Sequence, residues 1–229
     1  MASRCETVLN AVAIPEDPAP GSGGGPIQIG CVGRIHPGKG QQELLEAFAL
    51  AADDGAAFDC TLHYFGDVYP GNDHLLEELK TQAVAMGVEE RVRFHGFVPD
   101  PDDIYPLLDL VVAPSTSPES FSLVCAEAQA YGLPVVGPDR AGPAEIMVDG
   151  ETCLLVDSRD VGVLAAAIVR LVSDPGERER LGRAGRRRAE EQFTLSRYRE
   201  QFRRSVAMTI SARSEAHTRG RGKRTRISS

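Results

Sequence analysis

Two carboxylates stand eight residues apart where a buried strand gives way to a helix, an E-x7-E pattern. Asp109–Ala113 (DLVVA) is typical of a strand, Glu119 lies in the loop after it, and Glu127 lies inside the helix predicted over Phe121–Ala130. The neighbours of Glu127 in that helix are apolar, and a carboxylate in such surroundings needs a partner. Ribose hydroxyls are suitable partners in open α/β sheets, so we expect Glu127 to bind a ribose. Glu119 alone is also explained as a surface residue at a helix N-terminus.

A glycine-rich loop follows the first apolar run and leads into a predicted helix. It reads GRIHPGKG, from Gly33 to Gly40. Glycines let backbone N–H groups approach an anion, and a helix N-terminus carries partial positive charge. Arg34 and Lys39 together could neutralise a diphosphate without a metal ion. Taken alone, the loop is better explained as a surface turn with two solvated cations.

The same loop nearly matches the P-loop pattern of nucleoside triphosphate hydrolases. Gly33, Gly38 and Lys39 fit GxxxxGK, but Gly40 stands where a Ser or Thr hydroxyl would hold Mg²⁺. Asp67 is a weak candidate for a compensating magnesium ligand, and the NAD fingerprint GxGxxG is missing from this loop. A P-loop phosphotransferase is therefore disfavoured, and we expect neither a metal site nor a bound cofactor.

Strand-like and helix-like segments alternate with short connections along most of the chain. We predict strands at Ile27–Gly33, Phe58–Gly66, Arg91–Gly96, Asp109–Ala113, Leu133–Gly137 and Thr152–Val156. We predict helices at Gln41–Ala52, Asp73–Met86, Phe121–Ala130, 160–172, 176–191 and 195–208, with shorter helical pieces at Ile104–Leu108 and Ala144–Met147. This order predicts an α/β fold, a doubly wound, Rossmann-like parallel sheet with helices on both faces. Its ligand would bind beyond the carboxyl ends of the strands.

The two ends of the chain differ in composition from this domain, predicted over 27–208. Residues 1–26 end in PEDPAPGSGGGP, which predicts a flexible linker. Residues 209–229 carry six basic residues from Arg213 onward against Glu215 alone, and we predict a disordered basic tail. The net charge of −8 leaves about −13 on the rest of the chain, which does not match a nucleic-acid binder. Membrane association through the tail has no support beyond its charge.

The sequence gives no sign of membrane insertion or secretion. No apolar run reaches the length of a membrane span, and Met1 is not followed by a signal-peptide pattern, so we expect a cytoplasmic protein. The cysteines are odd in number, far apart and never spaced as CxxC, which predicts buried thiols rather than disulfides or a zinc site. They are Cys5, Cys31, Cys60, Cys125 and Cys153.

Five sequence blocks, taken in order, resemble the C-terminal domain of group 1 (family 4) retaining glycosyltransferases. The blocks are GRIHPGKG, RVRFHGFVPDPDDIYPLLDLVVAPS, ESFSLVCAE, AYGLPVV and GPAEIMVDGETCLLV, and the resemblance runs from about Val8 to about Phe202. It implies one half of a GT-B architecture, in which this domain holds a nucleoside diphosphate sugar. It also implies a partner, an N-terminal domain or subunit that binds the acceptor, and VLNAVAIPE resembles the family's hinge before that partner.

The resemblance also implies roles for individual residues. Arg34 and Lys39 look like a diphosphate clamp that stabilises the leaving group, and Glu119 looks like the residue that faces the donor sugar. These three are the implied catalytic residues, in a reaction that retains anomeric configuration through front-face attack. The donor-binding set carried over from the family comprises Gly33, Arg34, Lys39, Gly96, Phe97, Glu119, Phe121, Ser122, Leu123 and Glu127. Within it, Gly96 and Phe97 match the turn beside the nucleobase, and Glu127 matches the ribose ligand.

Two departures from the family pattern bear on function. The family usually has Phe-Gly where this chain has Phe121-Ser122, so a Cβ crowds the backbone nearest the donor. The acceptor-binding domain is also missing, so we expect the isolated chain to be inactive or dependent on a partner. The alternative to a transferase half is a non-catalytic module that binds nucleotide sugars without turnover.

Overall fold

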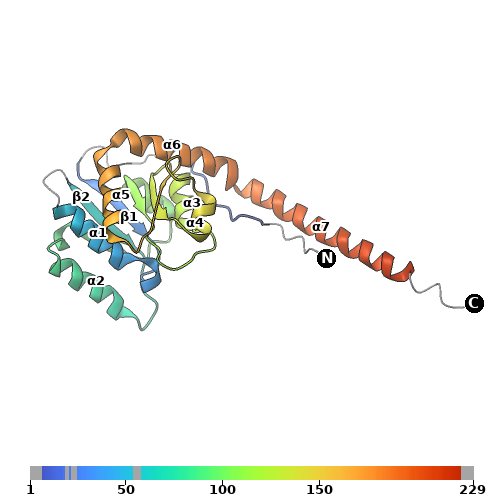
Figure 1. Ribbon diagram of the computed structural model, residues 1–229, viewed down its shortest axis with the longest axis horizontal. Coiled ribbons are helices and arrows are strands. Elements are labelled where there is room, and N and C mark those ends of the chain that lie inside the picture. Colours follow the sequence, from blue (N-terminus) through green and yellow to red (C-terminus); the bar gives the residue numbers. More distant parts are fainter. Residues whose placement is uncertain (1–6, 19–20, 22–24, 54–57, 223–229) are drawn as a thin grey trace, which may run out of the picture.

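The computed structural model describes residues 7–18, 21, 25–53 and 58–222, with side chains up to residue 210. Its centre is a six-stranded parallel sheet with the strand order β3-β2-β1-β4-β5-β6 (Figure 1). The strands are β1 (Ile27–Val32), β2 (Cys60–Phe65), β3 (Val92–Gly96), β4 (Leu110–Val112), β5 (Val135–Pro138) and β6 (Leu154–Val156).

Helices connect the strands and cover both faces of the sheet (Figure 1). The α-helices are α1 (Gln41–Asp53), α2 (Asp73–Ala85), α3 (Leu123–Ala130), α4 (Ala141–Ile146), α5 (Val161–Ser173), α6 (Pro175–Gln192) and α7 (Leu195–Gly222). Short 3-10 helices are η1 (Pro37–Lys39), η2 (Glu89–Arg91), η3 (Pro101–Asp103) and η4 (Tyr105–Leu107).

Alternation along the strands produces two hydrophobic cores, one on each face of the sheet. In β4, Leu110 and Val112 belong to the core that includes apolar residues of α1, α2 and α5. The residue between them, Val111, belongs to the second core, with residues of α3 and with Ala189 of α6. Because successive side chains of a strand point to opposite faces, a buried three-residue strand serves both cores. The predicted doubly wound fold is confirmed.

The strand order reverses between two neighbouring strands in the middle of the sheet. Strand β1 pairs in parallel with β2 on one side and with β4 on the other. The chain therefore leaves β1 and β4 in opposite directions, which opens a crevice between their carboxyl ends. The loop that starts at Gly33 and the loop that follows Val112 both begin at this switch point.

The segment before the domain is less detached than we predicted. Residues 7–18 form no helix or strand, yet Leu9, Val12 and Ile14 pack against the second core. The Val12 N–H donates to the Phe193 carbonyl at 2.9 Å, and the Arg186 guanidinium donates to the Pro15 carbonyl at 2.6 Å. Our prediction of a flexible linker is therefore wrong for 8–15, because its apolar side chains find a face of the domain to cover. Residues 1–6, 19–20 and 22–24 lie outside the described residues.

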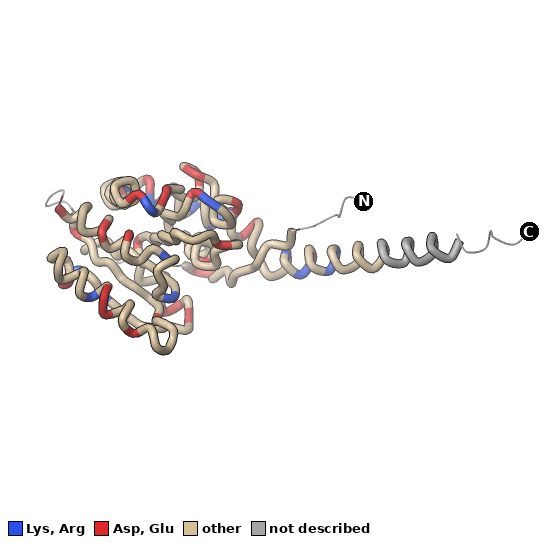
Figure 2. Tube along the Cα trace, turned by 60° about the horizontal axis from the view of Figure 1, so that its bottom comes forward, with Lys and Arg blue, Asp and Glu red and all other residues tan. Residues whose placement is uncertain are grey.

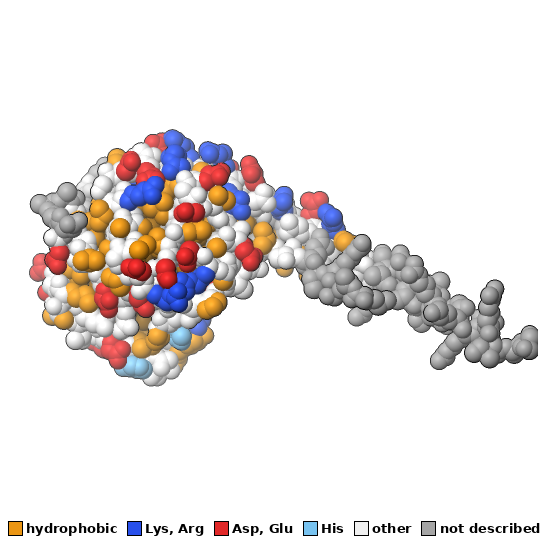
Figure 3. Space-filling view, viewed as in Figure 1, with side chains coloured by type: hydrophobic (Ala, Val, Ile, Leu, Met, Phe, Trp, Pro, Cys, Tyr) orange, Lys and Arg blue, Asp and Glu red, His pale blue; other side chains and the backbone are white. Residues whose placement is uncertain are grey.

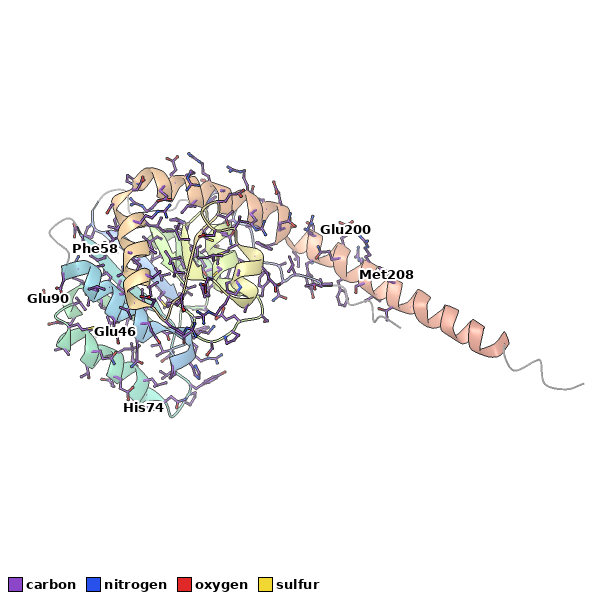
Figure 4. The ribbon with its side chains drawn as sticks, in the orientation of Figure 1. Glu46, Phe58, His74, Glu90, Glu200 and Met208 are labelled. Atoms are coloured by element: carbon purple, nitrogen blue, oxygen red, sulfur yellow. The ribbon has the colours of Figure 1, made fainter. Side chains whose placement is uncertain are left out.

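The C-terminal region is helical where we predicted disorder. Helix α7 continues to Gly222 and projects from the body, with Glu200 and Met208 along its exposed length (Figures 1 and 4). Residues 209–222 contain no proline and include several strong helix formers, so the helix that begins at Leu195 continues through them. The predicted disordered tail is thus wrong over 209–222, while 223–229 lie outside the described residues.

Positively and negatively charged residues are mixed over the body of the domain and do not form separate positive and negative patches (Figure 2). Along α6, Arg183 pairs with Glu179 and Arg186 pairs with Glu190. Over the face of the body that Figure 3 shows, blue and red side chains are intermixed. Within the described ranges, no helix has the length and apolarity that a bilayer crossing requires.

Four of the cysteines are buried free thiols, as predicted, and Cys5 lies outside the described residues. Burial raises the pKa of Cys31 to about 12, so this thiol remains protonated at neutral pH.

Helix α6 approaches the turn after α3 so closely that only glycine fits at one position. A Cβ on Gly182 would lie 2.0 Å from the carbonyl oxygen of Gly132, the turn residue after α3. We expect Gly182→Ala to lower the free energy of unfolding by about 1–3 kcal/mol, because a helix backbone must move. Urea unfolding of the purified chain measures this.

The matched control for that substitution is Gly162→Ala, in the first turn of α5. There an added Cβ comes no nearer than 3.4 Å to another group, the side chain of Asp160. Alanine favours helix over glycine, so this variant should be neutral or more stable by up to about 1 kcal/mol. Equal effects of the two variants would show that the Gly182 contact is not a constraint.

Candidate functional site

Two loops meet at the switch point and are locked together by their backbones. A Cβ on Gly40 would lie 1.9 Å from the Pro114 carbonyl oxygen, and Gly40 has a positive φ of 73°. The N–H groups of Thr116 and Ser117 both donate to the Gly38 carbonyl, at 3.2 and 3.1 Å. The glycine loop after β1 therefore rests directly on the loop after β4.

The loop after β1 is held from below by a buried glutamine. The Gln41 side chain amide donates to the Arg34 carbonyl at 2.9 Å, and its oxygen accepts from the His36 N–H at 3.4 Å. The Gln41 carbonyl in turn accepts from the hydroxyl of Tyr64 on β2 at 2.9 Å. His36 caps the short helix η1, because its ring nitrogen Nδ1 accepts from the Gly38 N–H at 3.1 Å. These contacts fix the backbone between the two cations.

The interlocked loops bring Lys39 and Glu119 into an ion pair. The Lys39 ammonium donates to Glu119 Oε1, and the Ser115 hydroxyl donates to the same oxygen at 2.6 Å. The Lys39 side chain is 42% exposed and that of Glu119 is 16% exposed, so one face of the pair is open to a ligand. Such a pair contributes little to stability, since solvent screens it.

Burial raises the pKa of Glu119, but its partners lower it by more. The hydrogen bonds from Lys39 and Ser115 and the charge of Lys39 favour the carboxylate, and the resulting pKa lies below the usual value of a glutamate. Glu119 is therefore ionised at neutral pH. It forms an ion pair with the ammonium of Lys39, which we predicted to be part of a diphosphate clamp.

The N-terminus of α3 opens beside this pair. The helix begins at Leu123 rather than at Phe121 as predicted, because Ser122 has φ +70° and ψ 87°, outside helical geometry. The first N–H groups of a helix have no intrahelical partner, and those of α3 start at Leu123, whose side chain is half exposed. The Phe121 ring is buried against Phe193 with centroids 5.6 Å apart, so only its backbone is available to a ligand.

A hollow of about 440 Å³ lies at the carboxyl ends of β1, β2 and β3. Gly33, Arg34 and Phe97 line it, together with Tyr69, and the Phe97 side chain is 75% exposed. The Arg34 guanidinium carbon lies 3.7 Å above the centroid of the Tyr69 ring, a cation–π contact. Gly96, one residue before Phe97, has φ +70°, which turns the chain at the end of β3.

Glu127 lies in the second turn of α3 and has a protein partner that the sequence did not reveal. The Tyr105 hydroxyl donates to Glu127 Oε2 at 2.8 Å. Burial raises the pKa of Glu127, and this hydrogen bond lowers it by less, so the pKa remains above the usual value. Glu127, the residue predicted to bind the ribose, thus has a half-buried carboxylate that one tyrosine holds by a hydrogen bond.

The first turn of helix α4, after β5, completes the surroundings of Glu119. The Gly142 N–H donates to the Glu119 carbonyl at 2.8 Å, and a Cβ on Gly142 would lie 2.3 Å from the carbonyl carbon of Ser120. Ala141, the first residue of α4, has φ +53°, so Ala141 and Ser122 are both non-glycine residues in the left-handed region. Strained backbone of this kind persists where the surrounding structure fixes it, often at functional sites.

The arrangement can bind an anion, and it does not suit a P-loop. Lys39 and the N-terminus of an eight-residue helix meet at the crevice between β1 and β4, and Arg34 lines the adjoining hollow. The position of the P-loop hydroxyl is Gly40, where the Pro114 carbonyl leaves no room for any side chain. Among the residues that the structure describes, no group of three or more His, Cys, Asp and Glu could hold a metal ion.

A second hollow, of about 540 Å³, opens at the opposite edge of the sheet, beside the amino ends of β4 and β5. Tyr131, Leu133 and several α6 arginines line it, including Arg183 and Arg186. None of the residues predicted to bind a ligand lies in its wall. We therefore place the candidate site at the carboxyl ends, where those residues gather.

The structure brings the predicted residues together in two adjoining groups. Lys39, Glu119 and Ser122 surround the start of α3, while Gly33, Arg34 and Phe97 line the hollow. Sequence analysis missed the residues that hold them, which are Gln41, Tyr64, Tyr69, Tyr105 and Ser115. Their partners are distant in sequence or set by loop geometry, so no local pattern identifies them.

Comparison with known proteins assigns the chain to a family. The model described as "Glycosyl transferases group 1" matches residues 15–188. Among curated relatives, a D-inositol 3-phosphate glycosyltransferase of Thermomonospora curvata is 36% identical over 162 residues, which cover 69% of this chain and 37% of the relative. The chain thus spans well under half the length of that relative.

Solved structures show the same fold. A crystal structure of Anabaena HepE in complex with UDP and glucose has a TM-score of 0.75 at 27% identity, over 80% of this chain and 48% of that one. The C-terminal domain of a group 1 glycosyl transferase, LpcC from Francisella tularensis, has a TM-score of 0.68 at 27% identity, over 82% of this chain and 97% of that domain.

The ion pair at the centre of the site can be tested in the free chain. We expect Lys39→Met to raise the pKa of Glu119, because burial then acts with less opposition. Carbon-13 NMR titration of the Glu119 carboxyl measures the shift. The control is Lys80→Met, which removes an exposed lysine paired with Glu77 on α2 and should leave Glu119 unchanged. An unchanged pKa in Lys39→Met would contradict the ion pair.

Proposed function

Because the chain belongs to the group 1 glycosyl transferases, we propose that it holds the nucleoside diphosphate sugar in a retaining glycosyl transfer. The observation that carries this proposal is the convergence of Lys39, Glu119 and the N-terminus of α3 at the switch point. Relatives support it, since HepE has been crystallised with UDP and with UDP-glucose. The proposed donor of this chain belongs to the same chemical class.

The proposed placement of the donor follows the two groups of residues. The nucleobase lies in the hollow beside Phe97 and Gly96, and the ribose hydroxyls bind Glu127. The diphosphate lies between Arg34, Lys39 and the first N–H groups of α3. Binding then requires Lys39 to turn from Glu119 toward the phosphate, which leaves the Glu119 carboxylate to accept hydrogen bonds from the sugar.

The proposed chemistry is electrostatic. The bond between the anomeric carbon and the diphosphate oxygen breaks, and negative charge builds on the leaving diphosphate. The two cations and the helix N-terminus stabilise this charge in place of a metal ion. The acceptor hydroxyl attacks the same face of the oxocarbenium-like sugar and transfers its proton to the diphosphate, so the configuration is retained.

The acceptor side of the reaction is proposed to come from outside this chain. The chain spans 37% of the Thermomonospora relative and 48% of HepE, so much of each protein has no counterpart here. We propose an N-terminal domain or separate subunit as the acceptor-binding partner. The alternative is a non-catalytic module that binds nucleotide sugars, and transfer activity restored by a co-purifying partner would exclude it.

Calorimetric titration with UDP, GDP and ADP and their sugars, in the presence of EDTA, tests the proposed donor site. We expect one nucleotide to bind saturably without metal. Arg34→Ala and Lys39→Ala should each weaken binding by about tenfold, the loss of one charge-assisted hydrogen bond.

The matched controls for this titration are Arg183→Ala and Lys80→Ala. These remove exposed cations of α6 and α2 that pair with nearby glutamates, away from the crevice. Both should leave the affinity unchanged. Binding that requires Mg²⁺, or that falls equally in the controls, would contradict the proposed clamp.

Ser122 provides a test of how closely the donor approaches the backbone. Its positive φ favours glycine, and its Cβ stands at the start of α3. We expect Ser122→Gly to tighten binding of the nucleotide sugar more than binding of the free nucleotide, since the sugar and its phosphates lie nearest the added space. Titrations of wild type and Ser122→Gly with the nucleotide sugar and with the free nucleotide measure the two changes in affinity. A loss of affinity for both ligands would contradict a close approach of the donor to this backbone.

A further inference from the structure

Tyr105 lies within the second of the five resembling sequence blocks but carries none of the implied donor-binding roles, and it contacts Glu127, the residue proposed to bind the ribose. Tyr105 lies in η4, on the crossover between β3 and β4, and its side chain is fully buried. Its hydroxyl donates to Glu127 Oε2 at 2.8 Å. Burial raises the pKa of Tyr105 well above its usual value, so the hydroxyl keeps its proton and remains a donor. The contact joins the crossover to the second turn of α3.

The position of Tyr105 is fixed by its neighbours. Its ring packs on Tyr131 at the end of α3, with centroids 4.9 Å apart, and the Tyr131 hydroxyl donates to Asp102 in η3. In the same crossover, the Leu108 side chain packs on β1 at Gly30, where an added Cβ would lie 2.2 Å from Leu108 Cδ1. Full burial and the packing on Tyr131 thus hold the Tyr105 ring at the position from which its hydroxyl reaches Glu127.

This contact leaves part of the carboxylate free for a ligand. Among the described residues, the Glu127 carboxylate has no hydrogen-bonding partner other than Tyr105. A carboxylate has about four lone-pair sites, and Tyr105 uses one of them on Oε2. Oε1 and the remaining site on Oε2 can accept two hydroxyl groups, which is the pattern that a ribose diol offers. Ile104, beside Tyr105, lines the hollow proposed for the base.

We propose that Tyr105 is a positioning residue, whose hydroxyl holds the Glu127 carboxylate in the orientation that accepts both ribose hydroxyls of the donor. This inference rests on the proposed function. A carboxylate on a glutamate side chain has three rotatable bonds, and fixing one oxygen in advance removes part of the ordering cost on binding. The competing explanation is that Tyr105 only joins the crossover to α3.

The experiment compares a nucleotide with its analogue lacking the ribose hydroxyls. The probes are whichever of UDP, GDP and ADP the wild-type chain binds, and the 2′,3′-dideoxy form of the same nucleotide. We expect Tyr105→Phe to weaken binding of the ribonucleotide about three- to tenfold, the effect of one hydrogen bond. Binding of the dideoxy nucleotide should change by less than about twofold, because it makes no contact with Glu127.

The matched control is Tyr131→Phe, which removes a hydroxyl from the same aromatic pair without touching Glu127. It should leave both affinities unchanged. A second readout needs no nucleotide: by carbon-13 NMR, the pKa of Glu127 should rise further in Tyr105→Phe and stay constant in Tyr131→Phe. Urea unfolding of both variants reports whether either loses its fold.

The outcomes separate the two explanations. Equal losses for the ribonucleotide and the dideoxy nucleotide in Tyr105→Phe would show a purely structural role and overturn the proposal. So would a Glu127 pKa that does not move. A wild-type chain that binds none of the nucleotides overturns the proposed function and this inference with it, and that result is read from the wild-type titration alone.

Discussion

The site depends on the close contact between the backbone of Gly40 and the carbonyl of Pro114, where no side chain fits. This contact, together with the two hydrogen bonds to the Gly38 carbonyl, ties the loop after β1 to the loop after β4. Lys39 and Glu119 meet because of it. The β1/β4 switch point supplies the crevice, and the interlocked backbones decide which side chains line it.

The polar contacts around the crevice share one design, in which each proposed ligand-binding group already has one partner. Lys39 is paired with Glu119, Arg34 lies on Tyr69, and Glu127 accepts from Tyr105. Partners of this kind orient side chains before a ligand arrives, which lowers the ordering cost of binding. The Lys39 pair differs from the others, since a diphosphate would compete directly with Glu119.

The succession of strands and helices along the chain could be predicted from apolar runs and helical spacing, because the two cores require them, whereas the order of the strands within the sheet was not predicted. Val111 between Leu110 and Val112 shows how a three-residue strand carries this signal. The start of α3 was misplaced by two residues, since the backbone of Ser122 depends on the loop around it. Our prediction of disorder for residues 209–222 was wrong, because a high content of charged residues does not by itself exclude a helix. The tie between Tyr105 and Glu127 joins residues 22 apart in sequence and depends on the crossover's path, so no motif predicts it.

The most direct test of the account is to map nucleotide binding onto the backbone. Amide chemical shifts of the isotope-labelled chain would be followed during titrations with UDP, GDP and ADP in the presence of EDTA. The account predicts that the largest changes fall on residues 33–40 and on the first turn of α3, at Leu123 and Val124. Changes centred on the opposite hollow, around Leu133 and Arg183, would contradict it and place the ligand at the amino ends of the strands.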